Sequence, residues 1–119
     1  MTKYQGRAFD PAETVRQIGR GNMMGISGLR WSTSGTGSDV YQLHLPVSNG
    51  YRVDIELAAD DTYTVRRVFS RKPKGQRFAE PVDYVKGERT GVYFDEVGLA
   101  AYYASCYRSY DETEWVAQS

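Results

Sequence analysis

The clearest pattern in the chain is the stretch YRVDIELAADDTYTVRRVF, residues 51–69. Apolar and polar side chains alternate in two runs, which is typical of antiparallel strands with one buried face. The apolar faces of the two strands match only across a loop with an odd number of residues, because a one-residue slip turns every side chain to the other face. The loop 59–61 meets this condition if Asp61 takes the left-handed conformation. The predicted hairpin then pairs Ile55 with Val65 on its inner face.

Further strands are expected on both sides of this hairpin. Residues 40–45 alternate like a strand and lead to a tight turn at Asn49–Gly50, and residues 82–89 form a last, weakly patterned strand. Residues 24–31, which contain two glycines, are also predicted as a strand. The segment 32–39 contains Ser, Thr, Gly and Asp but no apolar residue, so it is predicted as an exposed loop. Together these segments indicate an antiparallel sheet of four to five strands.

A helix is expected at each end of the chain. At the first, Asp10 supplies a cap, Pro11 suits the first helical position, and Gly19 and Gly21 end the helix. The second begins after Asp95 and has an apolar face formed by Val97, Ala100, Ala101, Ala104 and Tyr107, widened by Leu99, Tyr103, Cys106 and Tyr110. The sequence therefore predicts an α+β fold in which an N-terminal and a C-terminal helix pack on one face of the sheet.

The length and the net charge of the chain limit the classes of protein to which it can belong. The chain has 119 residues, of which 15 are basic and 15 acidic, so a single domain over 1–119 is expected, without bulk charge that favours nucleic acid or a membrane. Residues 1–9 and 111–119 are expected to fray.

The longest apolar run, 99–104, is too short to span a bilayer, and the opening residues lack the apolar core of a signal peptide. A cytoplasmic protein is expected.

The residue types that most often act in catalysis form no catalytic motif in this sequence. His44 is the single histidine and is expected to be exposed on its strand, without a nucleophile or an orienting partner. Cys106 is the single cysteine, which excludes an internal disulfide framework, and it is expected to be buried as a small apolar side chain. No calcium loop, two-histidine metal motif or phosphate-binding loop is present. We therefore expect no enzyme activity, no cofactor and no metal site.

One local cluster of positive charge follows the central hairpin. Its six cations, with no acid among them, are Arg66, Arg67, Arg71, Lys72, Lys74 and Arg77. With the neighbouring rings of Tyr63 and Phe78, this composition is typical of a groove that binds single-stranded DNA or RNA, although Phe69 is expected to face inward. The interpretation that we place first is a solvated face, on which Arg66 can neutralise Asp54 across the hairpin.

Tyrosine is the most frequent aromatic residue, with ten copies against four of phenylalanine. Around much of the circumference of the C-terminal helix lie Tyr102, Tyr103, Tyr107 and Tyr110. They cannot all face one small core, so some of this ring surface is expected to be exposed or to be buried against a partner. The partner is either another protein or a second copy of the chain in a homodimer. An edge strand of the sheet offers another route to protein binding, through strand addition.

Four short segments together resemble a known group of proteins. They are GN at 21–22, LP at 45–46, DTYTV at 61–65 and GVYFD at 91–95. In these segments the chain resembles a loose family of short proteins of actinobacterial phages, prophages and other mobile elements, whose members are generally of unknown function. The resemblance extends over about 15–107. It implies a phage-type accessory protein in the cytoplasm of a bacterial host, and it brings no catalytic or ligand residues.

These observations favour a non-catalytic accessory protein that binds a host or phage macromolecule. A protein is the preferred partner. The alternative is a nucleic acid bound through the basic face 66–77. An enzyme is the least favoured class.

Overall fold

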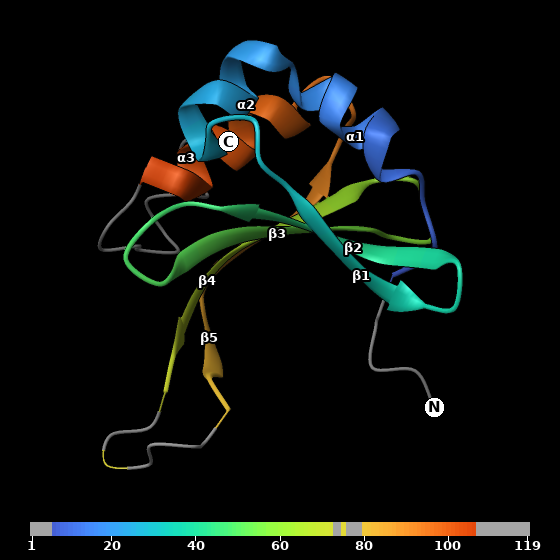
Figure 1. The fold of residues 1–119 in the computed structure, drawn as a ribbon. Helices are drawn as coiled ribbons and strands as arrows, with labels where there is room; N and C mark the ends of the chain where they lie inside the picture. Colours follow the sequence, from blue (N-terminus) through green and yellow to red (C-terminus); the bar gives the residue numbers. More distant parts are fainter. Residues whose placement is uncertain (1–5, 73–74, 76–79, 107–119) are drawn as a thin grey trace.

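The computed structural model describes residues 6–72, 75 and 80–106, which form a five-stranded antiparallel sheet and three helices (Figure 1). The strands are β1 (Ser32–Thr36), β2 (Asp39–Pro46), β3 (Tyr51–Leu57), β4 (Tyr63–Arg71) and β5 (Val82–Val92), and the helices are α1 (Pro11–Ile18), α2 (Arg20–Ser27) and α3 (Val97–Cys106). Each strand pairs with the next along the chain, so the sheet order is β1-β2-β3-β4-β5. The predicted α+β class with an antiparallel sheet is confirmed. Within these residues, no helix is long and apolar enough to cross a membrane.

The β3–β4 hairpin has the predicted register. Ile55 pairs with Val65, and Asp54 pairs with Arg66. Asp61 has a φ of 66°, the left-handed conformation that the odd-numbered loop requires. Local turn chemistry and the apolar pattern therefore select the same pairing, which is why the register could be predicted.

A tight turn at Asn49–Gly50 joins β2 to β3, with φ values of 56° and 87°. Positive φ at both central residues is typical of hairpin turns that match the twist of the strands. The turn places Leu45 opposite Val53, both in the core, and His44 opposite Asp54. Because side chains alternate along a strand, His44 and Asp54 share the face of the sheet that points away from the core.

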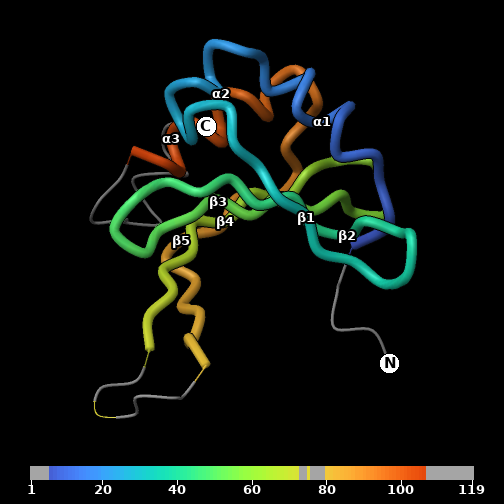
Figure 2. Tube along the Cα trace, viewed as in Figure 1, coloured from blue at the N-terminus to red at the C-terminus, as the bar shows by residue number. Residues whose placement is uncertain are grey.

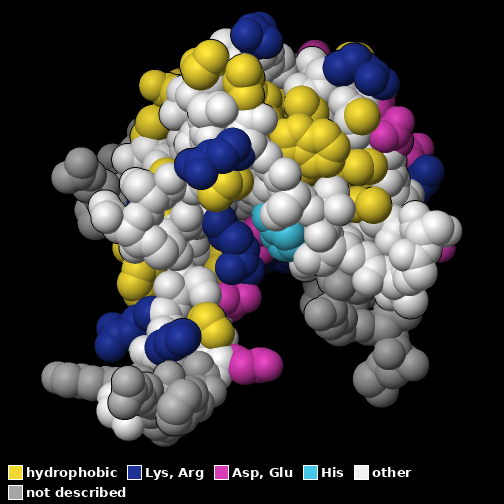
Figure 3. Space-filling model, viewed as in Figure 1, with side chains coloured by type: hydrophobic (Ala, Val, Ile, Leu, Met, Phe, Trp, Pro, Cys, Tyr) yellow, Lys and Arg dark blue, Asp and Glu magenta, His cyan; other side chains and the backbone are white. Residues whose placement is uncertain are grey.

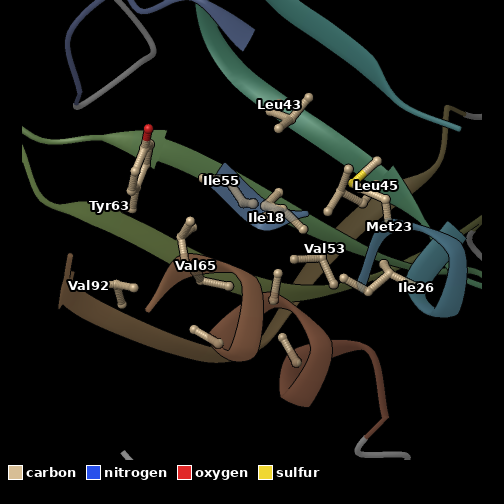
Figure 4. Packing of buried hydrophobic residues seen from close by; sticks show 14 residues of the cluster. Ile18, Met23, Ile26, Leu43, Leu45, Val53, Ile55, Tyr63, Val65 and Val92 are labelled. Carbon is tan, nitrogen blue, oxygen red and sulfur yellow. The ribbon is translucent and has the colours of Figure 1, made fainter. Parts of the chain in front are cut away.

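The helices of the described residues lie on the same side of the sheet, and the β4–β5 hairpin extends away from them (Figures 1 and 2). A continuous core fills the space between the helices and the sheet (Figure 4). The sheet contributes Leu43, Leu45, Val53, Ile55, Tyr63, Val65 and Val92, and the helices contribute Ile18, Met23, Ile26, Val97, Ala100, Ala101 and Ala104. Gly98 lets α3 approach α1 closely, since a Cβ at this position would lie 2.4 Å from the carbonyl oxygen of Ile18.

Helix α2 occupies most of the segment 24–31, so the strand predicted there is wrong. Met23 and Ile26 are buried, whereas Met24 is 52% exposed. A spacing of three between buried residues is helical, while a strand would bury alternate residues. Gly28, with a φ of 63°, ends the helix in the left-handed conformation. The two glycines of this segment therefore belong to a short helix and its cap rather than to a bulged strand.

The segment 32–39, predicted as an exposed loop, forms strand β1 and the turn to β2, so this prediction is also wrong. Ser34 lies opposite Gln42, and the register shifts between Ser34 and Gly35, which marks a β-bulge. Backbone hydrogen bonds to β2 hold this edge strand, and such bonds do not require an alternation of apolar side chains. Composition alone therefore did not distinguish this strand from a loop.

Residues 6–9, which belong to the predicted frayed end 1–9, are held against the sheet. The backbone N–H of Phe9 donates to the carbonyl oxygen of Val40 at 2.9 Å, and the Phe9 ring packs against the core. The expected fraying is therefore wrong for this part of the segment. The other end predicted to fray, 111–119, lies outside the described residues.

Candidate functional site

The face of the sheet opposite the helices carries a network of charged and polar side chains. Asp54 and Glu56 on this face are only 5% and 4% exposed. Carboxylates are almost never buried to this extent unless they are paired. We call the network the polar face, and it consists of Ser34, Gln42, His44, Arg52, Asp54, Glu56, Arg66, Asp83 and Glu88.

His44 lies between Ser34 and Asp54 on the polar face. Its Nδ1 is 2.7 Å from Asp54 Oδ1, and its Nε2 is 2.6 Å from Ser34 Oγ. The His44 side chain is 15% exposed, so the prediction of an exposed histidine without partners is wrong. The ring still reaches the molecular surface, where it forms the cyan patch in Figure 3. Three neighbouring strands, β1, β2 and β3, thus contribute one side chain each to a continuous hydrogen-bonded row.

Arg52 connects Asp54 to the β4–β5 hairpin. Its Nε donates to Asp54 Oδ1 at 2.8 Å, and its Nη2 donates to Asp83 Oδ2 at 2.7 Å. Burial acts to lower the pKa of the Arg52 guanidinium, but the hydrogen bonds to Asp83 and Asp54 outweigh it and raise this pKa. The same hydrogen bond from Arg52 lowers the pKa of Asp83 below its ordinary value. Arg52 and Asp83 are therefore both charged at neutral pH.

Arg66 is held by two carboxylates on the same face. It donates from Nη1 to Glu56 and from Nε to Glu88 Oε2, the latter at 2.6 Å. The expected ion pair with Asp54 is therefore wrong, although Asp54 and Arg66 are partners in the strand register. A cavity of about 150 Å³ lies beside this cluster, lined by Gly6, Glu56, Ala58, Thr64 and Arg66. The Glu56 Oε1 atom has no hydrogen-bond partner among the described residues.

Arg67 lies on the other face of β4 and is buried, with 2% of its surface exposed. Its Nη1 donates to the carbonyl oxygen of Ala104 at 2.5 Å, and its guanidinium carbon lies 4.1 Å from the centroid of the Tyr51 ring. Burial lowers the pKa of the Arg67 guanidinium. Arg67 thus joins the last turn of α3 to the sheet and is not accessible to a phosphate group.

The remaining cations of the predicted nucleic-acid site are separated from these two arginines. Arg71 and Lys72 are exposed at the far end of the β4–β5 hairpin, whereas Lys74 and Arg77 lie outside the described residues. Ion pairs and burial therefore divide the cluster that is continuous in the sequence. Among the cations of this cluster that the structure describes, Arg71 and Lys72 are the two that are open to solvent.

We call the free end of the β4–β5 hairpin the hairpin arm, residues 70–72 and 82–86. Tyr84 and Val85 are 45% and 58% exposed on this arm. The Nζ atom of Lys86 lies 5.6 Å from the centroid of the Tyr84 ring, within the range of a cation–π contact. Figure 3 shows Lys and Arg side chains along this projecting part of the molecule. The arm therefore presents cations next to an accessible aromatic ring.

An apolar patch covers the outer side of α2 and α3. Met24, Leu99 and Tyr102 are 52%, 53% and 38% exposed. The two helices meet at Gly25, where a Cβ would lie 3.1 Å from the Tyr102 ring. We call these four residues the α2–α3 surface. Apolar side chains over the helical layer are visible in Figure 3.

The four tyrosines of the predicted protein interface have different positions. Tyr102 belongs to the α2–α3 surface, and Tyr103 is half-buried with its ring centroid 6.5 Å from that of Tyr102. Tyr107 and Tyr110 lie outside the described residues. Cys106, near the end of α3, is exposed, so the prediction that this thiol is buried is wrong. The exposed side of α3 is thus wider than its sequence pattern indicates.

Comparison of the chain with protein-family models, with curated proteins and with solved structures gives no match. In the part of the chain that the structure describes, no group of three or more His, Cys, Asp or Glu side chains is placed to hold a metal ion. The polar face, the hairpin arm and the α2–α3 surface are therefore the features from which a function can be inferred.

One part of the polar face could have been predicted from the sequence. The Asn49–Gly50 turn and the apolar residues of β2 and β3 fix a register that pairs His44 with Asp54. Ser34 gave no comparable signal, because the segment 32–39 has no apolar alternation from which a strand and its register can be inferred.

Proposed function

We propose that this protein acts by binding another protein through the α2–α3 surface. The observation that carries the proposal is that Met24, Leu99 and Tyr102, three large apolar residues that are each more than a third exposed, lie on two helices that meet where Gly25 faces the Tyr102 ring. Single exposed apolar residues are common, but adjacent ones on two packed helices form a patch that water solvates poorly. Aromatic and Met side chains are also enriched in the central parts of protein interfaces.

We further infer that the protein is a phage-type accessory protein of the bacterial cytoplasm and that its partner is a host or phage protein. The support is the resemblance of the segments 21–22, 45–46, 61–65 and 91–95 to short proteins of actinobacterial phages and other mobile elements. Binding of this kind requires no catalytic step and no cofactor. A second copy of the chain is the alternative occupant of the same surface.

Site-specific photo-crosslinking in bacterial cells tests the protein-binding proposal. A benzophenone amino acid at Leu99 should give a discrete adduct of higher mass, while the same amino acid at Ser38, exposed in the β1–β2 turn, should give none. Met24→Asp should remove the Leu99 adduct, because a charge in the centre of an apolar interface is costly to desolvate. An equal pattern of adducts at both positions, or none at Leu99, would contradict the proposal. Sedimentation of the purified protein separates a homodimer from a complex with another protein.

Nucleic-acid binding by the hairpin arm is a second candidate function. The specific observation in its favour is that Arg71 and Lys72 are exposed on the same arm as Tyr84, whose ring is 45% exposed next to Lys86. Cations that neutralise phosphates, together with rings that stack on bases, are the components of single-strand binding sites. The buried or ion-paired Arg66 and Arg67 are not part of this candidate site.

Fluorescence anisotropy with labelled single- and double-stranded oligonucleotides tests this second function. Binding through the arm should weaken steeply as salt is raised, and Arg71→Glu with Lys72→Glu should abolish it without changing the melting temperature. Arg20→Glu, which reverses an exposed charge on α2, is the matched control and should leave the affinity unchanged. Absence of binding at low salt would exclude this function.

A further inference from the structure

We infer that Ser34, His44 and Asp54 form a nucleophilic site for acyl transfer, with Ser34 as the nucleophile. Both hydrogen bonds of such a site are present, 2.6 Å from Ser34 Oγ to His44 Nε2 and 2.7 Å from His44 Nδ1 to Asp54 Oδ1. A serine, a histidine and a carboxylate in this order are the geometric signature of an activated serine. This activity is independent of the protein binding proposed above and goes beyond it.

The chemistry of the three groups fixes the direction of each hydrogen bond. A carboxylate only accepts hydrogen bonds, so a neutral His44 imidazole beside Asp54 carries its hydrogen on Nδ1 and donates a hydrogen bond from Nδ1 to Oδ1. Nε2 then has a free lone pair and accepts the hydrogen bond from Ser34 Oγ. The nitrogen that faces the serine is therefore the one that can take its proton. Asp54 acts as the positioning residue for the histidine ring.

The surrounding structure fixes the position of Asp54. Asp54 is 5% exposed, lies directly opposite His44 in the strand register, and accepts a further hydrogen bond from Arg52 Nε at 2.8 Å. Arg52 is itself held by Asp83. The carboxylate is thus fixed by the sheet and by a charged side chain, which preorganises the histidine ring.

The nucleophile lies at the edge of the sheet beside a β-bulge. The strand β1 is the first in the sheet order, and its register shifts between Ser34 and Gly35. Position 35 accepts only glycine without a change in the backbone, because a Cβ there would lie 1.8 Å from the carbonyl oxygen of Asp39. Bulges at sheet edges commonly redirect a side chain next to a functional site.

The reaction that this geometry supports is hydrolysis of a small carboxylic ester with a good leaving group. Ser34 Oγ attacks the carbonyl carbon while its proton passes to His44 Nε2. The tetrahedral intermediate then collapses, the bond from the carbonyl carbon to the leaving oxygen breaks, and His44 returns the proton to that oxygen. A water molecule, deprotonated by His44 Nε2, next attacks the acyl carbon. The bond from that carbon to Ser34 Oγ then breaks, and His44 returns the proton to Oγ, which releases the carboxylic acid and restores Ser34. A small ester suits a nucleophile that lies on the open face of a sheet.

Covalent labelling with a fluorophosphonate tests this inference. Ser34 should form a bond to phosphorus with loss of fluoride, seen by mass spectrometry as a single adduct that maps to the peptide containing Ser34. Ser34→Ala should abolish the adduct, and Ser38→Ala, in the adjoining turn, should leave the rate unchanged. His44→Gln should slow the labelling by about a hundredfold or more, since a positioned general base contributes roughly this factor or more.

A second variant separates catalysis from folding. His44→Ala should label slowly, and added imidazole should restore part of the rate, which a purely structural histidine would not permit. Circular dichroism of each variant establishes that the fold is retained. No adduct at Ser34, or a rate that His44→Gln leaves unchanged in a folded protein, would overturn the inference and show that the row of hydrogen bonds only stabilises the sheet.

Discussion

At the scale of single residues, the hydroxyl of Tyr63 joins helix α1 to the sheet. It donates to Gln17 Oε1 at 2.6 Å and lies 3.0 Å from the Oγ1 of Thr14, which is 1% exposed. Tyr63→Phe should lower the free energy of unfolding by about 1–2 kcal/mol, because the buried Thr14 hydroxyl then loses this partner. Urea denaturation measures the effect. Tyr84→Phe, at an exposed ring, should change it by less than about 0.5 kcal/mol, and an equal loss in both variants would contradict the prediction.

Asp83 carries a second prediction at this scale, on the pH dependence of stability. Its hydrogen bond from Arg52 lowers its pKa below the ordinary 3.8, so the folded state favours the ionised form. The resulting stabilisation is complete above about pH 4 and is lost as the pH falls through the lower pKa of the folded state. The Asp83 side chain is 51% exposed, which limits the contribution to about 0.2–1 kcal/mol.

Chemical denaturation of wild type and Asp83→Asn at neutral and acid pH measures this difference. We expect the variant to be less stable at pH 7 and the gap to close in acid, where Asp83 is protonated in the wild type as well. A gap that stays constant between neutral and acid pH would show that the carboxylate charge is not its cause.

At the scale of secondary-structure elements, alanine substitutions at two glycines separate the effect of close helix packing on stability from the effect of helix propensity. Gly98 in α3 lies against α1, where a Cβ would meet the Ile18 carbonyl oxygen at 2.4 Å, whereas Gly21 in α2 has nothing within 4 Å of its Cβ position. Gly98→Ala should therefore destabilise the fold by about 1–3 kcal/mol, because α3 has to move away from α1. Gly21→Ala should stabilise it by up to about 1 kcal/mol through helix propensity. Thermal unfolding of both variants tests this, and shifts of the same sign would contradict it.

At the scale of the whole molecule, the core and the hairpin arm are separate in position. The core lies between the helices and the sheet, and the arm extends away from it (Figures 1 and 4). Arg71 pairs with Val82, so an Asn-Gly turn that replaces 72–81 can close the hairpin. The shortened protein should keep its stability to within about 1 kcal/mol, since surface changes away from the core have small effects.

The same shortened protein discriminates between the proposed functions. Oligonucleotide binding, if present, should weaken, because the replacement removes Lys72, Lys74 and Arg77 and leaves Arg71 and Tyr84. The crosslink from Leu99 and the labelling of Ser34 should persist. Calorimetry measures the stability, anisotropy measures the oligonucleotide binding, and mass spectrometry detects the crosslink and the labelling. Unfolding of the shortened protein would show that the replaced segment 72–81 contributes to the fold, contrary to this prediction.

The sequence by itself determined the central hairpin and the α+β class. The register of β3 and β4 follows from the apolar alternation, and the loop before Tyr63 follows from the tolerance of Asp61 for positive φ. The capped start of α1 at Asp10 follows in the same way from local rules, as does the burial of Val97, Ala100, Ala101 and Ala104 on α3. Leu99 was predicted to widen this apolar face, but it is exposed. These features depend on residues close together in the chain, for which turn chemistry and periodicity agree.

Only the tertiary structure decided the identity of α2, the existence of β1 and the role of each arginine in the predicted basic site. Arg66 and Arg67 are neighbours in the sequence, yet one is held by Glu56 and Glu88 and the other is buried under α3. The row from Ser34 to Asp54 likewise joins three strands. The physical reason is that ion pairs, burial and cross-strand hydrogen bonds depend on which segments the fold brings together, and periodicity along one segment does not contain that information.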